Sequence, residues 1–191
     1  MEIEKRARVA VFASGTGTNF EAMMADDNRE FEPVLLVCDK PKAHVIGKAA
    51  HYGVETLVLT PGSFPSKADY EKEILTKLER LKVEWIVLAG YMRIVGETLL
   101  EAYKNRIVNV HPSLLPSFPG KDAVGQAIDA GVKVSGVTIH FVDEGVDTGP
   151  IIAQEPVTVF QNDTDDSLQK RIQQVEHVLY TKIINDLTKE D

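Results

Sequence analysis

Short apolar runs rich in β-branched residues alternate along the chain with longer stretches in which apolar residues recur every three or four positions. The first pattern is typical of strands and the second of amphipathic helices. Strands are expected at residues 8–13, 34–38, 56–59, 83–88, 106–110, 133–142 and 151–159. Helices are expected from about residue 19, at 43–51, 67–82, 97–103 and 123–130, and from 167 to about 187. This alternation predicts an α/β fold.

The strand pattern also indicates how the sheet is covered. The run from Val83 to Leu88 is nearly all apolar, as strands covered on both faces tend to be. The last helix carries apolar residues at helical spacing, so one of its faces should pack on the sheet. No repeat, linker or low-complexity segment divides residues 1–191. We therefore predict one Rossmann-like domain with a twisted, mostly parallel sheet and helices on both faces.

Composition narrows the class of protein. The 191 residues are 43% hydrophobic and 26% charged, which is typical of a globular chain. The formal net charge of -8 argues against binding to nucleic acid or to an anionic membrane. The single cysteine, Cys38, favours a reducing compartment, and the charged start from Met1 to Arg8 is unlike a signal peptide. We expect a cytoplasmic protein without a nucleic-acid or membrane partner.

A glycine-bearing turn, Ser14-Gly15-Thr16-Gly17-Thr18, follows the first expected strand and precedes a helix. Free backbone N–H groups and the helix dipole favour an anion at such a place. Phe20 stands where a dinucleotide fingerprint has its third glycine, and no Walker-type Gly-Lys-Ser/Thr follows. The turn therefore fits a monophosphate better than a dinucleotide, and the alternative is a tight turn without a ligand.

Asn109 and His111 end the strand at 106–110 and share one side of it, because residues two apart on a strand point the same way. Ligands of open α/β sheets lie beyond the carboxyl ends of the strands. An Asn amide can donate to a developing oxyanion and a His can move a proton. Asp147, in the polar loop 143–150, is placed to orient the His111 ring and favour its charged form. The alternative is that these side chains only satisfy nearby backbone.

These segments together resemble the phosphoribosylglycinamide formyltransferase family, the folate-dependent third enzyme of purine synthesis. The resemblance covers nearly the whole chain. It rests on residues 13–19, 88–94, 109–116, 147–150 and 176–177. It implies that the formyl group of 10-formyltetrahydrofolate, the co-substrate, passes to the amine of 5-phosphoribosylglycinamide.

The resemblance also implies roles for individual residues. Asn109, His111 and Asp147 correspond to the catalytic side chains. The residues that correspond to contacts of the phosphorylated substrate are Gly17, Thr18, Asn19 and Glu176. Those that correspond to folate contacts are Lys67, Met92, Arg93, Ile94, Val95 and, again, Asn109. Further lining of the folate pocket is expected from Tyr91, Ile107 and Val142. His140 shares a strand face with Val142, so one alternative brings it towards the site, but a strand histidine with satisfied nitrogens is the favoured interpretation. No residue spacing suggests zinc, so we expect no metal.

The implied division places the phosphate-binding half at about residues 1–105 and the catalytic and folate half at about 106–191, in a monomer or homodimer. One alternative is a formyltetrahydrofolate hydrolase, which uses the same three side chains with water as acceptor but usually carries an extra N-terminal domain. A transferase acting on initiator tRNA would usually add a C-terminal domain. A catalytically silent folate- or nucleotide-binding module is the third, although it would need no acid–base pair.

Overall fold

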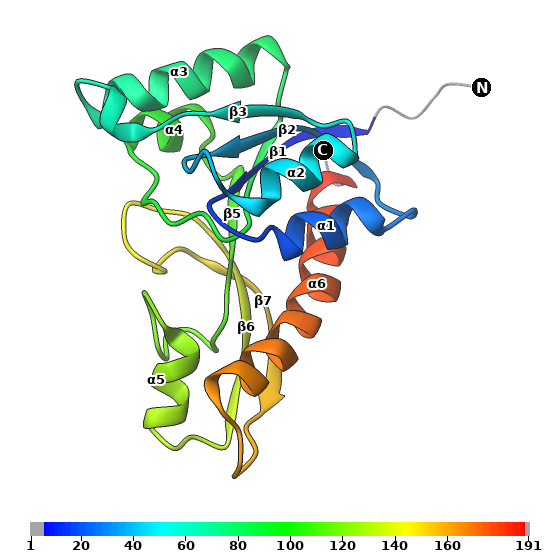
Figure 1. Ribbon diagram of the computed structural model, residues 1–191, viewed down its shortest axis with the longest axis vertical. Helices are drawn as coiled ribbons and strands as arrows, with labels where there is room; N and C mark the ends of the chain where they lie inside the picture. Colours follow the sequence, from blue (N-terminus) through cyan, green and yellow to red (C-terminus); the bar gives the residue numbers. More distant parts are fainter. Residues whose placement is uncertain (1–5, 190–191) are drawn as a thin grey trace.

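The computed structural model describes residues 6–189, so residues 1–5 of the charged N-terminal segment lie outside it. A single seven-stranded sheet has the order β3-β2-β1-β4-β5-β6-β7 (Figure 1). Neighbouring strands from β3 to β5 are parallel, whereas β6 is antiparallel to β5 and β7 to β6. The strands are β1 Ala7–Ala13, β2 Phe31–Cys38, β3 Glu55–Val58, β4 Trp85–Leu88, β5 Ile107–His111, β6 Val134–Phe141 and β7 Ile151–Thr158. The prediction of a mostly parallel α/β sheet is confirmed.

Helices cover both faces of this sheet, as the sequence pattern predicts (Figure 1). The helices are α1 Thr18–Ala25, α2 His44–His51, α3 Lys67–Arg80, α4 Glu97–Ala102, α5 Ala123–Asp129 and α6 Asp165–Lys189, with a 3-10 turn at Pro61–Ser63. Alternate residues of β1 face opposite sides: Val9 and Val11 pack with α1, α2 and α6, whereas Ala10 and Phe12 pack with α3 and α4.

The predicted starts of two strands, β2 and β4, differ from the observed ones by more than one residue, for physical reasons. β2 begins at Phe31 and contains Pro33, which lacks a backbone N–H. Pro33 pairs with Val9 where the register shifts, so its missing donor falls at an irregularity in the ladder. β4 begins at Trp85 because the N–H of Val83 instead donates to Leu78 O at 2.9 Å, at the end of α3.

The long helix α6 is tied to the centre of the sheet through Tyr180. The buried Tyr180 hydroxyl is within 2.9 Å of Leu88 O and 3.0 Å of Val108 O, at β4 and β5. Burial raises the pKa of this hydroxyl well above its ordinary value, so it remains a donor. This hydroxyl therefore fixes the position of α6 over the carboxyl end of β4 and the first residues of β5. Among residues 6–189, no helix is both long and apolar enough to span a membrane.

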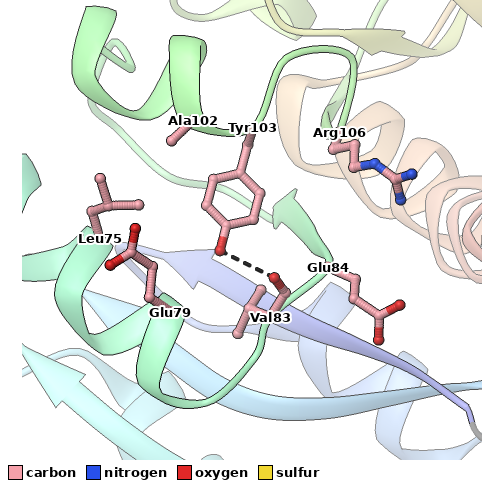
Figure 2. A pocket seen from close by; sticks show the side chains of 7 residues that line it. All are labelled: Leu75, Glu79, Val83, Glu84, Ala102, Tyr103 and Arg106. Atoms are coloured by element: carbon pink, nitrogen blue, oxygen red, sulfur yellow. Dashed lines mark hydrogen bonds between the residues drawn. The ribbon is translucent and has the colours of Figure 1, made fainter.

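A small hollow of about 380 Å³ lies at the amino ends of β4 and β5 (Figure 2). The Tyr103 ring crosses it, and its hydroxyl donates to Val83 O at 3.1 Å. Burial raises the pKa of Tyr103 to about 12. This hydroxyl therefore serves as a structural donor, and the larger cleft lies at the opposite, carboxyl edge of the sheet.

Candidate active site

A cleft of about 810 Å³ opens along the carboxyl ends of the strands. Its walls come from residues 15–19 after β1, 88–95 after β4, 109–112 at the end of β5, 120–124 before and within α5, and several residues between 140 and 147. Side chains of α6 close one end, namely Gln169, Gln173 and Glu176. The cleft thus brings together the glycine turn, the predicted folate segment and the predicted catalytic side chains.

Gly17 makes the first turn possible. Its φ of +71° lies in the left-handed region, and a Cβ at this position would collide with the Val45 side chain. The first backbone bond of α1 runs from the N–H of Glu21 to Gly17 O at 3.0 Å, so the N–H groups of residues 18–20 precede it. The turn therefore aims N–H donors and the positive end of the helix dipole at the cleft, where an anion is favoured.

Glu176 and Asn19 form a buried pair next to this turn. Asn19 Nδ2 donates to Glu176 Oε2 at 3.1 Å, and both side chains are buried. Burial raises the pKa of Glu176, while the bond from Asn19 acts in the opposite direction. Asn19 Oδ1 is buried and finds no hydrogen-bond partner within residues 6–189. The pair therefore brings a carboxyl group to the cleft wall beside the phosphate turn, next to an acceptor that has no partner among the described residues.

His111 is held by the proline-rich loop that follows β5. Its Nε2 lies 2.8 Å from Phe118 O, and since a carbonyl only accepts, Nε2 carries the hydrogen. Its Nδ1 lies 3.3 Å from Asp147 Oδ2. Nδ1 is therefore the nitrogen that can gain or lose a proton while this loop is in place, and the Asp147 carboxylate faces it.

Asp147 joins two loops. It lies in the left-handed region at φ 55°, which a short polar side chain tolerates better than a branched one. Its Oδ2 accepts the N–H of Gly120 at 2.7 Å, so the loop after β6 is tied to the loop after β5. The contact between His111 and Asp147 predicted from sequence is thus present in the structure.

Asn109 is oriented by His140 on the neighbouring strand. The register pairs these two residues, and their Nδ2 and Nε2 atoms are 3.2 Å apart. His140 Nδ1 lies 2.7 Å from Phe141 O and must carry the hydrogen, so Nε2 accepts from the Asn109 amide. Burial lowers the pKa of His140, against the opposing effects of Phe141 O and Asp147, and favours the neutral ring. One N–H of the Asn109 amide donates to His140, and the other can donate to a ligand.

Both alternatives that the sequence left open for His140 hold in the structure. Both ring nitrogens do have partners, but the ring lines the cleft, with Nε2 3.7 Å from Asp147 Oδ1. The pairing of His140 with Asn109 could be found only from the antiparallel register of β5 and β6, which the sequence pattern does not give.

The predicted folate segment forms an open rim. Met92 and Ile94 are 63% and 57% exposed, whereas Val95 is buried beneath them. Exposed apolar side chains at the mouth of a cleft are typical of a surface that an apolar ligand covers. Arg93 lines the cleft as well, and so do Tyr91 and Val142.

Two predicted contacts are not brought to the cleft. Ile107 was expected to line the folate pocket, and this prediction is wrong: it is 1% exposed and packs with Leu99 and Tyr103 in the core. It shares one side of β5 with Asn109 and His111, but at the start of the strand this side belongs to the core, which includes Leu99 of α4. Lys67 begins α3 beside Gly96 and is absent from the cleft walls, so its contact with folate stays a prediction.

Within residues 6–189, no three His, Cys, Asp or Glu side chains are grouped so that they could hold a metal.

Comparison with known proteins adds to this geometry. Residues 7–184 match the family described as Formyl transferase. A phosphoribosylglycinamide formyltransferase of Bacillus subtilis (strain 168) is 50% identical over 183 residues, which cover 94% of each chain. A trifunctional purine biosynthetic protein adenosine-3 of Drosophila melanogaster is 40% identical over 187 residues, covering 95% of this chain but 14% of that protein.

Solved structures give the same result. The crystal structure of glycinamide ribonucleotide transformylase 1 from Geobacillus kaustophilus superimposes with a TM-score of 0.94 at 51% identity, covering 96% of this chain and 100% of the other. A phosphoribosylglycinamide formyltransferase from Bacillus halodurans gives 0.91 at 51% identity, with 94% of each chain covered. The similarity therefore extends over the sheet, the cleft and α6 together.

Proposed function

This chain belongs to the formyl transferase family, and we propose that Asn109, His111 and Asp147 perform its chemistry in the cleft. The reaction moves the formyl group of 10-formyltetrahydrofolate to the amine of 5-phosphoribosylglycinamide, giving formylglycinamide ribonucleotide and tetrahydrofolate in purine biosynthesis. The function predicted from sequence is confirmed at this level. The relatives give no support to the hydrolase or to a catalytically silent module.

The two substrates fit different parts of the cleft. The phosphate of the glycinamide substrate lies against the backbone N–H groups of Gly17, Thr18 and Asn19, where the turn and the α1 dipole favour an anion. Glu176 accepts donors of the same substrate. The folate lies along Met92 to Val95 and buries the exposed apolar side chains of Met92 and Ile94. The formyl carbon is thereby placed between the two sites, beside Asn109 and His111.

The substrate amine attacks the formyl carbon, and the carbonyl electron pair moves to oxygen. The free N–H of Asn109 donates to this oxyanion, while the positive charge of protonated His111 stabilises it through space. A donor that is already oriented does not need to reorganise as the charge develops. The bond from Asn109 to His140 supplies that orientation.

The attacking nitrogen must then lose a proton, and the departing folate nitrogen must gain one. The Asp147 carboxylate takes the proton from the attacking nitrogen, and Nδ1–H of protonated His111 gives its proton to the departing folate nitrogen. Because Asp147 Oδ2 and His111 Nδ1 lie 3.3 Å apart, the proton on Asp147 then passes to Nδ1 and restores both groups. Nε2 cannot take this part while it donates to Phe118 O. When the tetrahedral intermediate collapses, the carbonyl re-forms and the bond to the folate nitrogen breaks. The products are the formylated amine and tetrahydrofolate.

The meeting of these three polar side chains with the phosphate turn in one cleft carries the catalytic assignment. The test mixes purified protein with 10-formyltetrahydrofolate, with and without glycinamide ribonucleotide, and follows deformylated folate. We expect turnover only when the acceptor is present. Turnover without the acceptor would indicate the hydrolase, and folate binding without turnover would indicate the silent module.

Some properties rest on the sequence and the relatives alone. We propose a cytoplasmic location, supported by the single buried Cys38 and by relatives in purine biosynthesis. We propose a monomer or homodimer, which sedimentation analysis would distinguish. One domain over residues 1–191, with halves that meet near residue 105, also stays a proposal. The cleft draws its phosphate turn and its proposed folate rim, residues 92–95, from the first half and its catalytic side chains from the second, so the name of a folate half does not fit residues 106–191 alone.

A further inference from the structure

We propose that Asp39, which lies outside the catalytic group, is a positioning residue that holds the folate-facing segment 92–95 against the phosphate-binding turn. The inference rests on the function proposed above. It concerns a buried carboxylate for which neither the sequence pattern nor the transfer chemistry gives a role.

The register of the parallel strands places three chain segments side by side. Cys38 at the end of β2 pairs with Ala13 of β1, and Phe12 of β1 pairs with Leu88 of β4. The residues that follow these strands are therefore neighbours at the carboxyl edge. Ser14 N donates to Gly90 O at 3.0 Å, which continues the pairing one step beyond the sheet.

Asp39 collects two hydrogen bonds at this edge. Its side chain is 1% exposed, Ser14 Oγ donates to Oδ1 at 2.5 Å, and Arg93 Nε donates to Oδ2 at 2.8 Å. The N–H of Met92 in turn donates to Ser14 Oγ at 2.9 Å. Two consecutive residues, Met92 and Arg93, thus reach the same carboxylate by different routes, and the bonds close into a ring.

Because a carboxylate can only accept hydrogen bonds, Asp39 determines which group of this ring donates to which. A serine hydroxyl has one hydrogen, and because Ser14 gives it to Asp39, its lone pairs face the N–H of Met92. Bonds to a charged acceptor are shorter and stronger than bonds between neutral groups. A neutral amide at position 39 would weaken both bonds to the ring and leave the Ser14 hydroxyl free to rotate. The backbone at Met92, and with it the exposed rim at Met92 and Ile94, would lose its fixed position.

The chain offers a matched control at Asp163. Its side chain is 4% exposed and accepts a hydrogen bond from Ser167 Oγ at 2.7 Å. It also accepts one from each terminal nitrogen of Arg171, at 2.7 and 2.8 Å. It thus shares the serine and arginine partners of Asp39. Neither Asp163 nor Arg171 lines the cleft. Replacing either carboxylate should therefore lower the stability of the fold, but only the replacement of Asp39 should weaken folate binding.

The experiment compares Asp39→Asn with Asp163→Asn in the full chain. For Asp39→Asn we expect the KM for 10-formyltetrahydrofolate and the Kd for tetrahydrofolate to rise about 10- to 100-fold, with kcat and the KM for glycinamide ribonucleotide within about threefold of wild type. For Asp163→Asn we expect unchanged folate constants and a lower Tm. An unchanged folate KM in Asp39→Asn, or equal losses in kcat and both KM values, would overturn the proposal.

Ser14→Ala provides a second variant if Asp39→Asn does not fold. It keeps the pair of Asp39 and Arg93 but removes the acceptor of the Met92 N–H. We expect the same split between folate KM and kcat, with a rise of about 3- to 10-fold, and an unchanged folate KM would again overturn the proposal. If the wild type shows no acceptor-dependent turnover, the proposed function fails separately, since the tetrahydrofolate Kd still reports on Asp39.

Discussion

The two walls of the cleft are built in different ways. The catalytic wall, residues 109–111 and 140–147, presents polar side chains that orient one another through contacts between β5, β6 and the loop after β6. The binding wall, residues 14–19 and 90–95, presents backbone N–H groups at the phosphate turn and exposed apolar side chains at the folate rim, on turns in which Gly17 and Gly90 have positive φ. A change in the first wall should therefore slow the chemical step, and a change in the second should weaken binding.

The strongest way to break this comparison is to change the catalytic wall. In His111→Ala or Asp147→Asn we expect kcat to fall about 10²- to 10⁴-fold, because the stabilised oxyanion and the proton path are lost. Both KM values should stay within a few-fold of wild type. Single-turnover rates measure the chemical step, and calorimetry checks that the fold is intact. Rates within tenfold of wild type in both variants would remove the assignment.

The binding wall should respond in the opposite sense. Gly17→Ala places a Cβ at φ +71° and against Val45, at a strain cost of roughly 1–2 kcal/mol. We expect the KM for glycinamide ribonucleotide to rise at least tenfold and kcat to change much less. Gly47→Ala is the control, because Gly47 lies inside α2 with open space around it, and this variant should be neutral or slightly stabilising. A Gly17→Ala variant that lost kcat alone would contradict the comparison.

Glu176 sharpens the comparison through pH. Its pKa is raised by burial, so the folded protein binds this proton more tightly than the unfolded chain. The stability it contributes is fully present below the ordinary value of 4.5 and is lost as pH rises through the raised pKa. We expect Glu176→Gln to remove that fall in stability while raising the KM for glycinamide ribonucleotide about tenfold.

Urea unfolding of the wild type and of Glu176→Gln, measured from below pH 4.5 upward, gives the pH dependence of the free energy of unfolding. Asp166→Asn is the control on the same helix, since the Asp166 side chain is 77% exposed and pairs with Lys170 at the surface. Its stability should change by less than about 1 kcal/mol. Equal pH dependence in the wild type and in Glu176→Gln would show that the carboxylate is not the cause.

The smallest effect is expected away from both walls. In Tyr103→Phe the bond to Val83 O at the amino edge of the sheet is lost, and the free energy of unfolding should fall by about 1 kcal/mol (Figure 2). Neither kcat nor any KM should change. Chemical denaturation gives the first quantity and steady-state kinetics the second. A kinetic defect here would mean that the two ends of the sheet are coupled.

Much of the fold follows from the sequence because the apolar spacing of single elements is a local property. The runs at 8–13 and 83–88 predict β1 and β4 to within two residues. The start of β2 was missed because Pro33 argues against a strand unless an irregularity in the ladder accommodates it. The strand order, with β1 between β2 and β4 and two antiparallel strands at one edge, depends on packing between distant segments.

The candidate site divides along the same line. Asn109 and His111 are visible in the sequence because they end an apolar strand, and Asp147 because it lies in a glycine-bearing loop. Asp39 also follows an apolar strand, yet its partners Ser14 and Arg93 lie 25 and 54 positions away. Ile107 was assigned to the cleft by resemblance to the family, whereas its burial with Leu99 and Tyr103 depends on tertiary packing that the sequence pattern does not give.

The central claim is that His111 and Asp147 act as one unit on the formyl carbon. A double-mutant cycle on the single-turnover rate, with His111→Ala, Asp147→Asn and both together at saturating substrates, tests it directly. We predict that the double variant is no more than a few-fold slower than the slower single variant, because either change already disables the unit. Losses that multiply, with each change slowing the rate independently of the other, would contradict the claim.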